Sequence, residues 1–291
     1  MLTLGIDAGA SATKWALLDS SRVFREGTSL PMDGHINNNE SKIRMLEVLN
    51  EISIAAHPER VSAIYAGITG IAETGDGTAE ISKIFLSVFG EVPIHLVSDI
   101  ELGYHANFAL GEGIFLYAGT GSIAIHINKE GETFRAGGWG YLLGDEGAGY
   151  WIGREAIRKI LLSLESSSGI LSDSFEDRVL RFIHCQDWKD IKSFVYSPDR
   201  SKIAEITRLV VELAEKNDEL AIQILQEGAS ALANLVWRLE ATLGEEKLPV
   251  VFAGGLSAEG NPLSRELIRQ LARPVRISHV RAANRAAELA R

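Results

Sequence analysis

The sequence predicts an α/β protein made of two similar halves. Short runs of apolar residues end in glycine turns, which is typical of strands. Longer segments carry an apolar residue at every third or fourth position, which is typical of helices. The N-terminal order is a β-meander with a glycine turn after its first strand, followed by helices, and it recurs after residue 110. We therefore expect two halves, each a meander followed by helices.

The first half is expected to alternate strands and helices after its opening meander. Segment 40–55, for example, carries Ile43, Leu46, Leu49 and Ile52 at helical spacing. Strands are expected at 2–7, 14–18, 23–26, 61–68 and 92–97, and helices at 40–55, 79–88 and 100–110.

The second half opens with another meander and continues into a mostly helical block between 149 and 243. Strands are expected at 113–117, 122–128, 133–136, 249–252 and 275–280, and helices at 149–164, 173–183, 202–216, 220–243, 262–272 and 281–291. The polar segment 33–39 and the turn-rich segment 137–149 are the loops expected to carry chemistry, because binding residues concentrate on loops.

Length and composition predict a soluble globular protein. The chain has 291 residues, enough for two domains of common size. Hydrophobic residues make up 46% and charged residues 23%, and no apolar stretch reaches the roughly 18 to 20 residues that a membrane-spanning helix needs. Segment 1–7 has no basic leader and runs directly into a strand, so we expect a cytoplasmic location.

Charge and cysteine content exclude several kinds of site. The net charge of −10 disfavours nucleic acid as a partner, since no basic block reverses that field. Cys185 is the single cysteine, so one chain forms no internal disulfide and no multi-thiolate metal site. We expect Cys185 to be buried in packing.

Three glycine-rich turns, each directly after a run of apolar residues, are the most informative feature of the chain. They lie within 4–14, 115–122 and 251–257. Glycine lets main-chain N–H groups approach an anion closely. Each turn alone is also compatible with an ordinary tight turn, but together with hydroxyl groups and an acidic residue they indicate a nucleotide held from several sides.

The layout resembles that of the sugar kinase, Hsp70 and actin superfamily. Within it, the segment 135–153, RAGGWGYLLGDEGAGYWIG, closely resembles the loop of the BadF/BadG/BcrA/BcrD ATPase family and of its N-acetylglucosamine kinase branch. The resemblance implies two ribonuclease-H-like (actin-like ATPase) domains with ATP in an interdomain cleft. These domains are expected at 1–110, with helix 281–291 packing back, and at 111–280, with a helical insertion. The resemblance also implies a homodimer and the Mg²⁺-dependent transfer of the γ-phosphoryl group of ATP to a sugar.

The resemblance assigns nucleotide-binding residues to all three turns. Asp7 would hold Mg²⁺, which prefers hard oxygen ligands, although a turn-capping role stays open. The residues expected to contact ATP are Gly9, Ser11, Thr13 and Lys14 in the first turn, Gly119, Thr120, Gly121 and Ser122 in the second, and Gly254, Gly255 and Leu256 beside the adenosine. Lys14 is alternatively a solvated strand residue.

Asp99 is the expected general base. It follows a strand, at the position where kinases of this family place the acid that accepts the sugar hydroxyl proton. Alternatively, Asp99 only caps the next helix. Glu101 is a weaker candidate that is expected to face solvent.

The sugar is expected to contact Thr69, Gly70, Trp139, Gly140 and Asp145, in addition to Asp99. The Trp139 indole would cover the apolar face of the ring and Asp145 would accept hydroxyl hydrogen bonds. Packing of Trp139 under its loop is the alternative. Glu146 would either bind sugar or brace the loop.

The chain departs from the family pattern in two places. Ala8 and Ala10 replace glycines that are common in the first turn. The sugar-contacting asparagine has no clear counterpart, and either Asp33 or Asn37 would substitute for it. If the Asp33 carboxylate faces the sugar's C2 substituent, a cationic amino sugar is favoured over its acetylated form.

We therefore expect an ATP-dependent kinase of an amino sugar: N-acetylglucosamine, glucosamine or a relative such as N-acetylmuramate. The 6-hydroxyl as acceptor is implied by the resemblance alone. A sugar- or nucleotide-sensing protein without turnover is the alternative. The family's dehydratase activators need two cysteines per subunit, because two subunits together hold one iron–sulfur cluster. This chain has only one cysteine, so we do not expect it to be such an activator. A zinc-containing repressor is disfavoured for the same reason.

Overall fold

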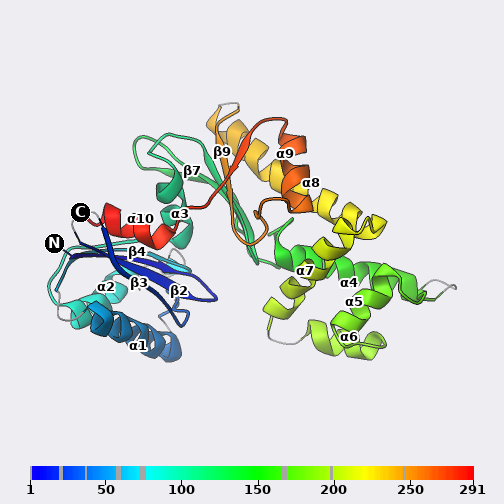
Figure 1. The fold of residues 1–291 in the computed structure, drawn as a ribbon, viewed down its shortest axis with the longest axis horizontal. Helices are drawn as coiled ribbons and strands as arrows, with labels where there is room; N and C mark the ends of the chain where they lie inside the picture. The colour runs from blue at the N-terminus through cyan, green and yellow to red at the C-terminus, as the bar shows by residue number, and fades with distance from the viewer. Residues whose placement is uncertain are drawn as a thin grey trace. The chain divides into compact units, whose positions relative to one another are not determined.

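The computed structural model describes residues 2–19, 22–36, 38–56, 60–71, 77–165, 169–196, 199–244 and 247–291. It divides into unit 1, Met1–Ala109 with His279–Arg291, and unit 2, Leu110–Ser278. Each unit contains one five-stranded mixed sheet with helices packed on it (Figure 1). The predicted α/β class with two ribonuclease-H-like folds is confirmed. Within the described ranges, none of the helices has the length and apolar character needed to cross a membrane.

The sheet of unit 1 brings three strand ends to one edge. Its strands are β1 (Leu2–Ala8), β2 (Thr13–Asp19), β3 (Arg22–Ser29), β4 (Val61–Ile68) and β5 (Ile94–Val97), in the order β3-β2-β1-β4-β5. β1, β2 and β3 form an antiparallel meander, while β4 runs parallel to β1 and β5 parallel to β4. The carboxyl ends of β1, β4 and β5 therefore share one edge of the sheet.

Helices cover both faces of this sheet. α1 (Asn39–Ala56) and α2 (Gly77–Phe89) lie on one side, and α3 (Asp99–Asn107) and α10 (Ala282–Leu289) on the other (Figure 1). Alternate residues of β1 and β2, such as Ile6 and Trp15, pack in the hydrophobic core between the sheet and helices α1 and α2, whereas Ala16 packs against α10. This alternation decides which face each side chain near the strand ends points to.

Gly5 lets the C-terminal helix α10 pack directly on the first strand. A Cβ at Gly5 would lie 2.0 Å from the carbonyl oxygen of Ala283 and 2.2 Å from the amide nitrogen of Ala287. The Thr3 hydroxyl on the same face donates to the Ala287 carbonyl at 2.7 Å. Both ends of the chain are thereby joined in unit 1.

The sheet of unit 2 repeats this topology. Its strands are β6 (Ile114–Ala118), β7 (Ser122–Ile127), β8 (Thr133–Gly137), β9 (Val250–Ala253) and β10 (Val275–Ile277), in the order β10-β9-β6-β7-β8. β6 is central, pairs antiparallel with β7 and parallel with β9, and so corresponds to β1 of unit 1. The turns after β6 and β9 therefore meet at one sheet edge.

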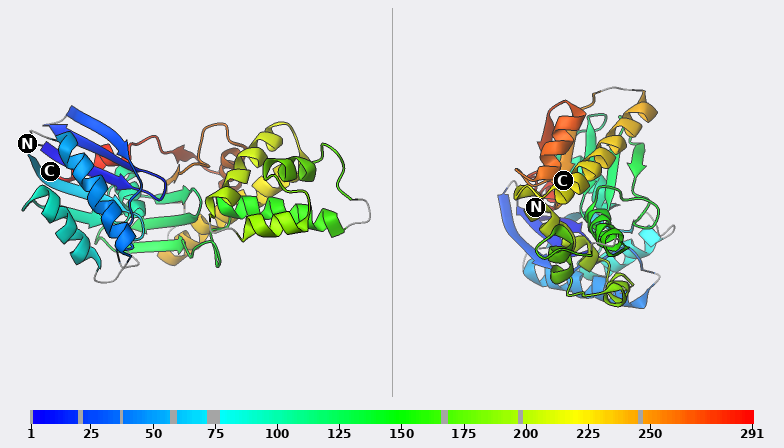
Figure 2. Two further views of the ribbon diagram at one scale, coloured as in Figure 1. Left: turned by 90° about the horizontal axis from the view of Figure 1, so that it is seen from below. Right: turned by 90° about the vertical axis from the view of Figure 1, so that its right-hand side faces the viewer.

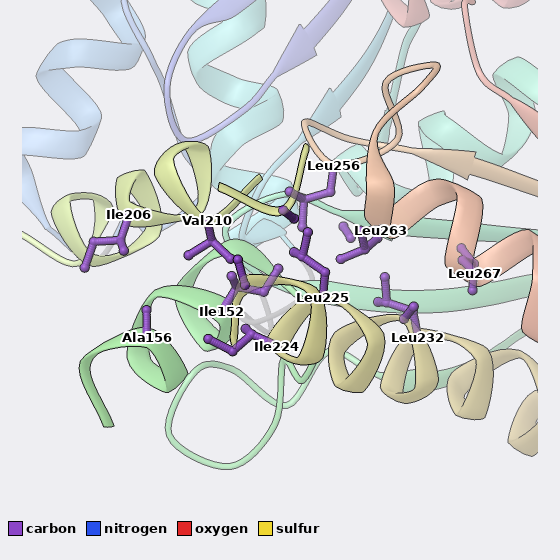
Figure 3. Packing of buried hydrophobic residues seen from close by; sticks show 14 of the residues in the cluster. Ile152, Ala156, Ile206, Val210, Ile224, Leu225, Leu232, Leu256, Leu263 and Leu267 are labelled. Carbon is purple, nitrogen blue, oxygen red and sulfur yellow. The ribbon is translucent and has the colours of Figure 1, made fainter. Parts of the chain in front are cut away.

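Six helices are described in unit 2, and most of its core lies among them. They are α4 (Gly149–Glu165), α5 (Phe175–Phe182), α6 (Trp188–Val195), α7 (Ser201–Glu215), α8 (Glu219–Leu243) and α9 (Pro262–Leu271), seen from two more sides in Figure 2. Leucine, isoleucine and valine side chains of α4, α7, α8 and α9 pack together in one cluster (Figure 3). α4 and α7 approach closely because Gly153 has no side chain, and a Cβ there would lie 1.9 Å from the Ile203 carbonyl oxygen.

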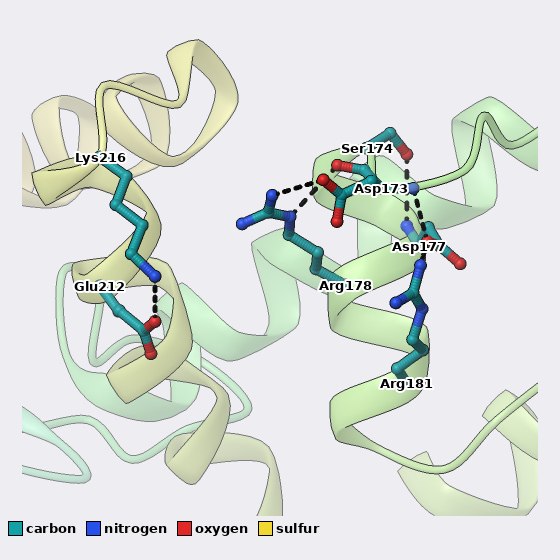
Figure 4. A network of polar contacts seen from close by, with 7 residues as sticks. All are labelled: Asp173, Ser174, Asp177, Arg178, Arg181, Glu212 and Lys216. Atoms are coloured by element: carbon teal, nitrogen blue, oxygen red, sulfur yellow. Dashed lines mark hydrogen bonds and ion pairs between the residues drawn. The ribbon is translucent and has the colours of Figure 1, made fainter.

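Polar contacts at the surface order the ends of these helices (Figure 4). Ser174 caps α5 by accepting from the Asp177 amide at 3.3 Å, and the Asp177 carboxylate pairs with Arg181 one turn later. Lys216 pairs with Glu212 at the end of α7 at 2.5 Å. Such exposed pairs contribute little individually, so the buried cluster supplies most of the stability of this region.

The structure corrects several element boundaries. No helix was predicted for α6, a short segment whose N-terminus is capped by the Asp187 carboxylate. The last strand ends at Ile277 rather than at residue 280, and the helix after β5 begins at Asp99. Cys185 is buried, as expected.

Gly5→Ala is expected to destabilise the protein by about 1–3 kcal/mol, because the added methyl pushes α10 off β1. Urea unfolding followed by circular dichroism measures this change. Gly255→Ala is the control, since a Cβ there meets nothing within 4 Å. Equal midpoints for Gly5→Ala and the unmodified protein would contradict the described packing.

Candidate active site

Two acidic residues meet at the carboxyl edge of the unit 1 sheet. Asp7 lies near the end of β1, opposite Gly67 on β4, and Asp99 follows β5 at the start of α3. The Asp99 Oδ1 atom accepts from the Ile100 amide at 3.0 Å, and its carboxylate also accepts from the Thr69 hydroxyl. The structure thus brings together three residues that the sequence singled out.

The surroundings of Asp99 raise its pKa to about 6. Burial is the largest cause and the nearby Asp7 charge adds to it, while the bonds from Ile100 and Thr69 act in the opposite direction. Burial also raises the pKa of Asp7, against the attraction of the Lys14 ammonium. A carboxyl group that titrates near neutral pH is suited to accept a proton from an alcohol.

Ser98, and not Asp99, caps α3. The Ser98 hydroxyl accepts from the Glu101 amide at 3.1 Å, and the Glu101 carboxylate accepts from the Ser98 amide at 3.0 Å. This reciprocal capping box satisfies the helix N-terminus. It leaves Asp99 without the capping role and gives Glu101 a structural one, where a solvent-facing side chain was expected.

The first glycine turn joins β1 to β2. The Gly9 amide donates to the Ala12 carbonyl at 3.1 Å and closes the turn. Ser11 and Lys14 are exposed. Ala8 is fully buried in the core, so its methyl points away from the turn. Ala10 lies exposed at the tip.

Thr13 is placed differently from its neighbours. Its side chain points to the α1 face, like Trp15, and is fully buried. Among the residues that the structure describes, its hydroxyl oxygen finds no hydrogen-bond partner. This placement favours packing over a phosphate contact.

The loop at Asp33 packs against Thr69 and Gly70. The Gly34 amide donates to the Thr69 carbonyl at 2.9 Å, and the His35 ring lies where a Cβ on Gly70 would be only 2.5 Å from its Cε1 atom. The Asp33 Oδ1 atom accepts from the His35 amide at 2.9 Å and faces its ring Nδ1 at 3.1 Å. The Asp33 carboxylate is thus engaged within its own loop. Asn37, the other candidate, lies outside the described residues.

The second glycine turn, in unit 2, is tied to the start of α4. The Gly149 amide donates to the Gly119 carbonyl at 2.8 Å, and the Tyr150 amide donates to the Thr120 carbonyl at 3.2 Å. Within the turn the Gly119 amide bonds the Gly121 carbonyl at 2.9 Å. The turn is held rigidly, with Thr120 and Gly121 at its tip.

Asp145 folds back onto this turn. Its Oδ1 atom accepts from the Ser122 amide at 3.3 Å, and its carboxylate also accepts from the Gly140 amide. Burial is the main cause that raises its pKa. The Ser122 hydroxyl donates to the Glu146 carbonyl at 2.9 Å. Sequence reasoning predicted a sugar contact for Asp145 and missed its contact with the turn.

Trp139 stands out from the protein and does not pack under its loop. The residue is 55% exposed, and the Arg135 guanidinium lies 4.7 Å from the ring centre. Gly140 follows with φ +80°, a conformation that favours glycine. An exposed indole next to a glycine turn is suited to stack on a sugar ring.

The third turn meets the second at the sheet edge of unit 2. Gly254 has φ +101°, and a Cβ there would lie 2.2 Å from the Ala118 carbonyl oxygen. The Leu256 amide donates to the same carbonyl at 3.3 Å, while its side chain enters the core (Figure 3). Gly255 faces open space. The Leu256 carbonyl accepts from the Ser264 hydroxyl at 2.9 Å, so the side chain and both main-chain groups of Leu256 hold the turn in place.

The donor set at Asp7 fits a magnesium ion better than a metal that is enclosed by protein ligands alone. The described parts of the chain contain no group of three or more His, Cys, Asp or Glu that could enclose a metal. Mg²⁺ keeps several waters and uses only one or two carboxylates together with phosphate oxygens. The buried Asp7 carboxyl meets that requirement.

The family model for BadF/BadG/BcrA/BcrD ATPases matches residues 4–285. The chain belongs to this family. Among curated relatives, an N-acetylmuramic acid/N-acetylglucosamine kinase of Clostridium acetobutylicum is 31% identical over 268 residues, covering 87% of this chain and 84% of the relative. An N-acetyl-D-glucosamine kinase of Dictyostelium discoideum is 35% identical over 149 residues, covering 49% of this chain and 46% of the relative.

A solved structure shares the fold along the whole chain. A Chromobacterium violaceum protein, provisionally assigned as an N-acetylglucosamine kinase, has a TM-score of 0.76 with 24% identity, and the match covers 100% of this chain and 99% of that one. At that identity the likeness supports the fold alone.

Thr13→Val is expected to raise the free energy of unfolding by about 1 kcal/mol, because it removes a buried hydroxyl without a partner. ATP affinity should stay unchanged, as measured by calorimetry. Ser11→Ala is the matched variant, and we expect it to weaken ATP binding because that hydroxyl is exposed at the turn. Weaker ATP binding by Thr13→Val would instead place its hydroxyl on a phosphate.

Proposed function

We propose that this protein is an ATP-dependent kinase that phosphorylates an amino sugar. The observation that carries the proposal is the Asp99 carboxyl group, buried beside Asp7, bonded to Thr69 and with a pKa raised to about 6. Membership of the ATPase family and the similarity to an N-acetylmuramic acid/N-acetylglucosamine kinase support ATP and an amino sugar as substrates.

Asp99 is proposed to activate the acceptor hydroxyl. Its carboxylate accepts the hydroxyl proton while the sugar oxygen bonds to the γ-phosphorus and ADP leaves. The Thr69 hydroxyl bond fixes the orientation of the carboxylate. Because the transition state is loose, orientation and charge stabilisation matter more than a strong base.

The glycine turns are proposed to bind the nucleotide. In unit 2, the amides of Thr120, Gly121 and Ser122 would donate to phosphate oxygens, and the open space at Gly255 would leave room for the nucleoside. In unit 1, Ser11 and Lys14 would add a hydroxyl and a positive charge, and Gly9, which has no side chain, would let a phosphate oxygen approach the turn closely. Magnesium, held by Asp7, would neutralise phosphate charge when bound.

The sugar is proposed to stack on Trp139 and to contact Thr69, Gly70 and Gly140. Two observations favour the N-acetylated form over glucosamine: the Asp33 carboxylate is engaged by His35, and the curated relatives are named for N-acetylated sugars. Phosphorylation at the 6-hydroxyl, homodimerisation and a cytoplasmic location stay predictions.

The alternative hypothesis is a sugar- or nucleotide-sensing protein without catalytic turnover, and an activity assay distinguishes it from a kinase. In a coupled assay of ADP release over hexoses and amino sugars, we expect the highest kcat/KM on an N-acetylated amino sugar. Asp99→Ala should lower kcat by about 10²- to 10⁴-fold, because it removes the proton acceptor, and should leave ATP affinity nearly unchanged. Ser98→Ala serves as control for the helix start. Full activity of Asp99→Ala would exclude the assigned base.

The pH dependence follows from the same carboxyl group. Only its ionised form accepts a proton, so kcat/KM for the sugar should be level above the pKa and fall about tenfold per pH unit well below pH 6. Initial rates between pH 4.5 and 8 measure this profile, with circular dichroism confirming that the protein stays folded. A profile that is flat down to pH 4.5 would contradict the role of Asp99.

A further inference from the structure

We propose that Asp145 is a positioning residue that couples nucleotide binding at the second glycine turn to sugar binding at the Trp139–Gly140 loop. This inference rests on the proposed kinase function and adds a link between its two substrates within unit 2. It assigns to Asp145 a role in the order and cooperativity of binding.

The carboxylate lies against the turn at the place a phosphate would use. Asp145 Oδ1 accepts from the Ser122 amide at 3.3 Å, and Oδ2 lies only 2.7 Å from where a Cβ on Gly121 would be. The missing side chain at Gly121 therefore makes room for this carboxylate. One amide hydrogen cannot serve a carboxylate and a phosphate oxygen fully at the same time.

Charge makes the competition stronger. Asp145 is only 9% exposed, so its negative charge is poorly screened near the turn. Its backbone has φ +61°, a conformation that Asp and Asn tolerate better than most residues. The carboxylate is thus held at the turn by its loop, and a bound phosphate is expected to displace it from Ser122.

The Asp145 carboxylate accepts its second hydrogen bond from the Trp139–Gly140 loop. Asp145 also accepts from the Gly140 amide, next to the exposed Trp139 indole. When phosphate takes the Ser122 amide, the carboxylate shifts together with this loop and can accept bonds from sugar hydroxyls. Nucleotide and sugar then strengthen each other's binding, and the effect is reciprocal.

The test measures the affinity of an ATP analogue with a β,γ-imido bridge, with and without N-acetylglucosamine, by calorimetry. Asp145→Asn keeps the shape and the positive φ but loses the charge. It should bind the analogue about fivefold more tightly than the unmodified protein when sugar is absent, and sugar should no longer tighten that binding. Glu130→Gln, which removes an exposed charge of the same unit at the opposite end of β7 from the turn, is the control and should change analogue affinity less than twofold.

Asp145→Gly suits the positive φ, removes both bonds and keeps the test valid if Asp145→Asn folds poorly. We expect the same tightening. Unchanged or weaker analogue binding by both variants, or full retention of the sugar effect, would overturn the inference while leaving the kinase function intact. If the unmodified protein binds no nucleotide, the proposed function itself fails, and the inference with it.

Discussion

The chemistry of this protein depends on one arrangement: a carboxyl group of Asp99 buried beside a second carboxyl group at a sheet edge. Burying a negative charge near another is unfavourable, and it raises the pKa of Asp99. The parallel strands β1, β4 and β5 impose this proximity because their carboxyl ends coincide. The capping box of Ser98 and Glu101 satisfies the helix N-terminus by other groups, so Asp99 stays available to a substrate.

Unit 2 repeats the topology but uses its edge differently. The turn after β6 carries glycine and hydroxyl groups, and the turn after β9 approaches it closely because Gly254 has no side chain. No metal-binding carboxylate was predicted at this edge. Its buried acid, Asp145, comes from a distant loop and contacts the main chain of the turn. One topology thus provides an acidic edge in unit 1 and an amide-rich edge in unit 2.

Features carried by local pattern were predictable from the sequence. Asp7 and Asp99 each lie at the end of an apolar run, which placed them at the sheet edge. Two features that we did not predict also have local signals in the sequence. The spacing of Ser98 and Glu101 is that of a capping box. Thr13 lies two residues before Trp15 on the same strand, so both side chains point to the core. The contacts of Asp145 with Ser122, and of His35 with Gly70, join residues far apart in sequence. Only the folded chain reveals them.

The central claim is that Asp99 holds a raised pKa because it is buried next to Asp7. The most direct measurement is an NMR titration of the aspartate carboxyl carbons in isotope-labelled protein, with the Asp99 signal assigned by its absence in Asp99→Asn. The account predicts a midpoint near pH 6 that falls in Asp7→Asn, where the neighbouring charge is removed. A midpoint near the ordinary 3.8, unaffected by Asp7→Asn, would contradict it.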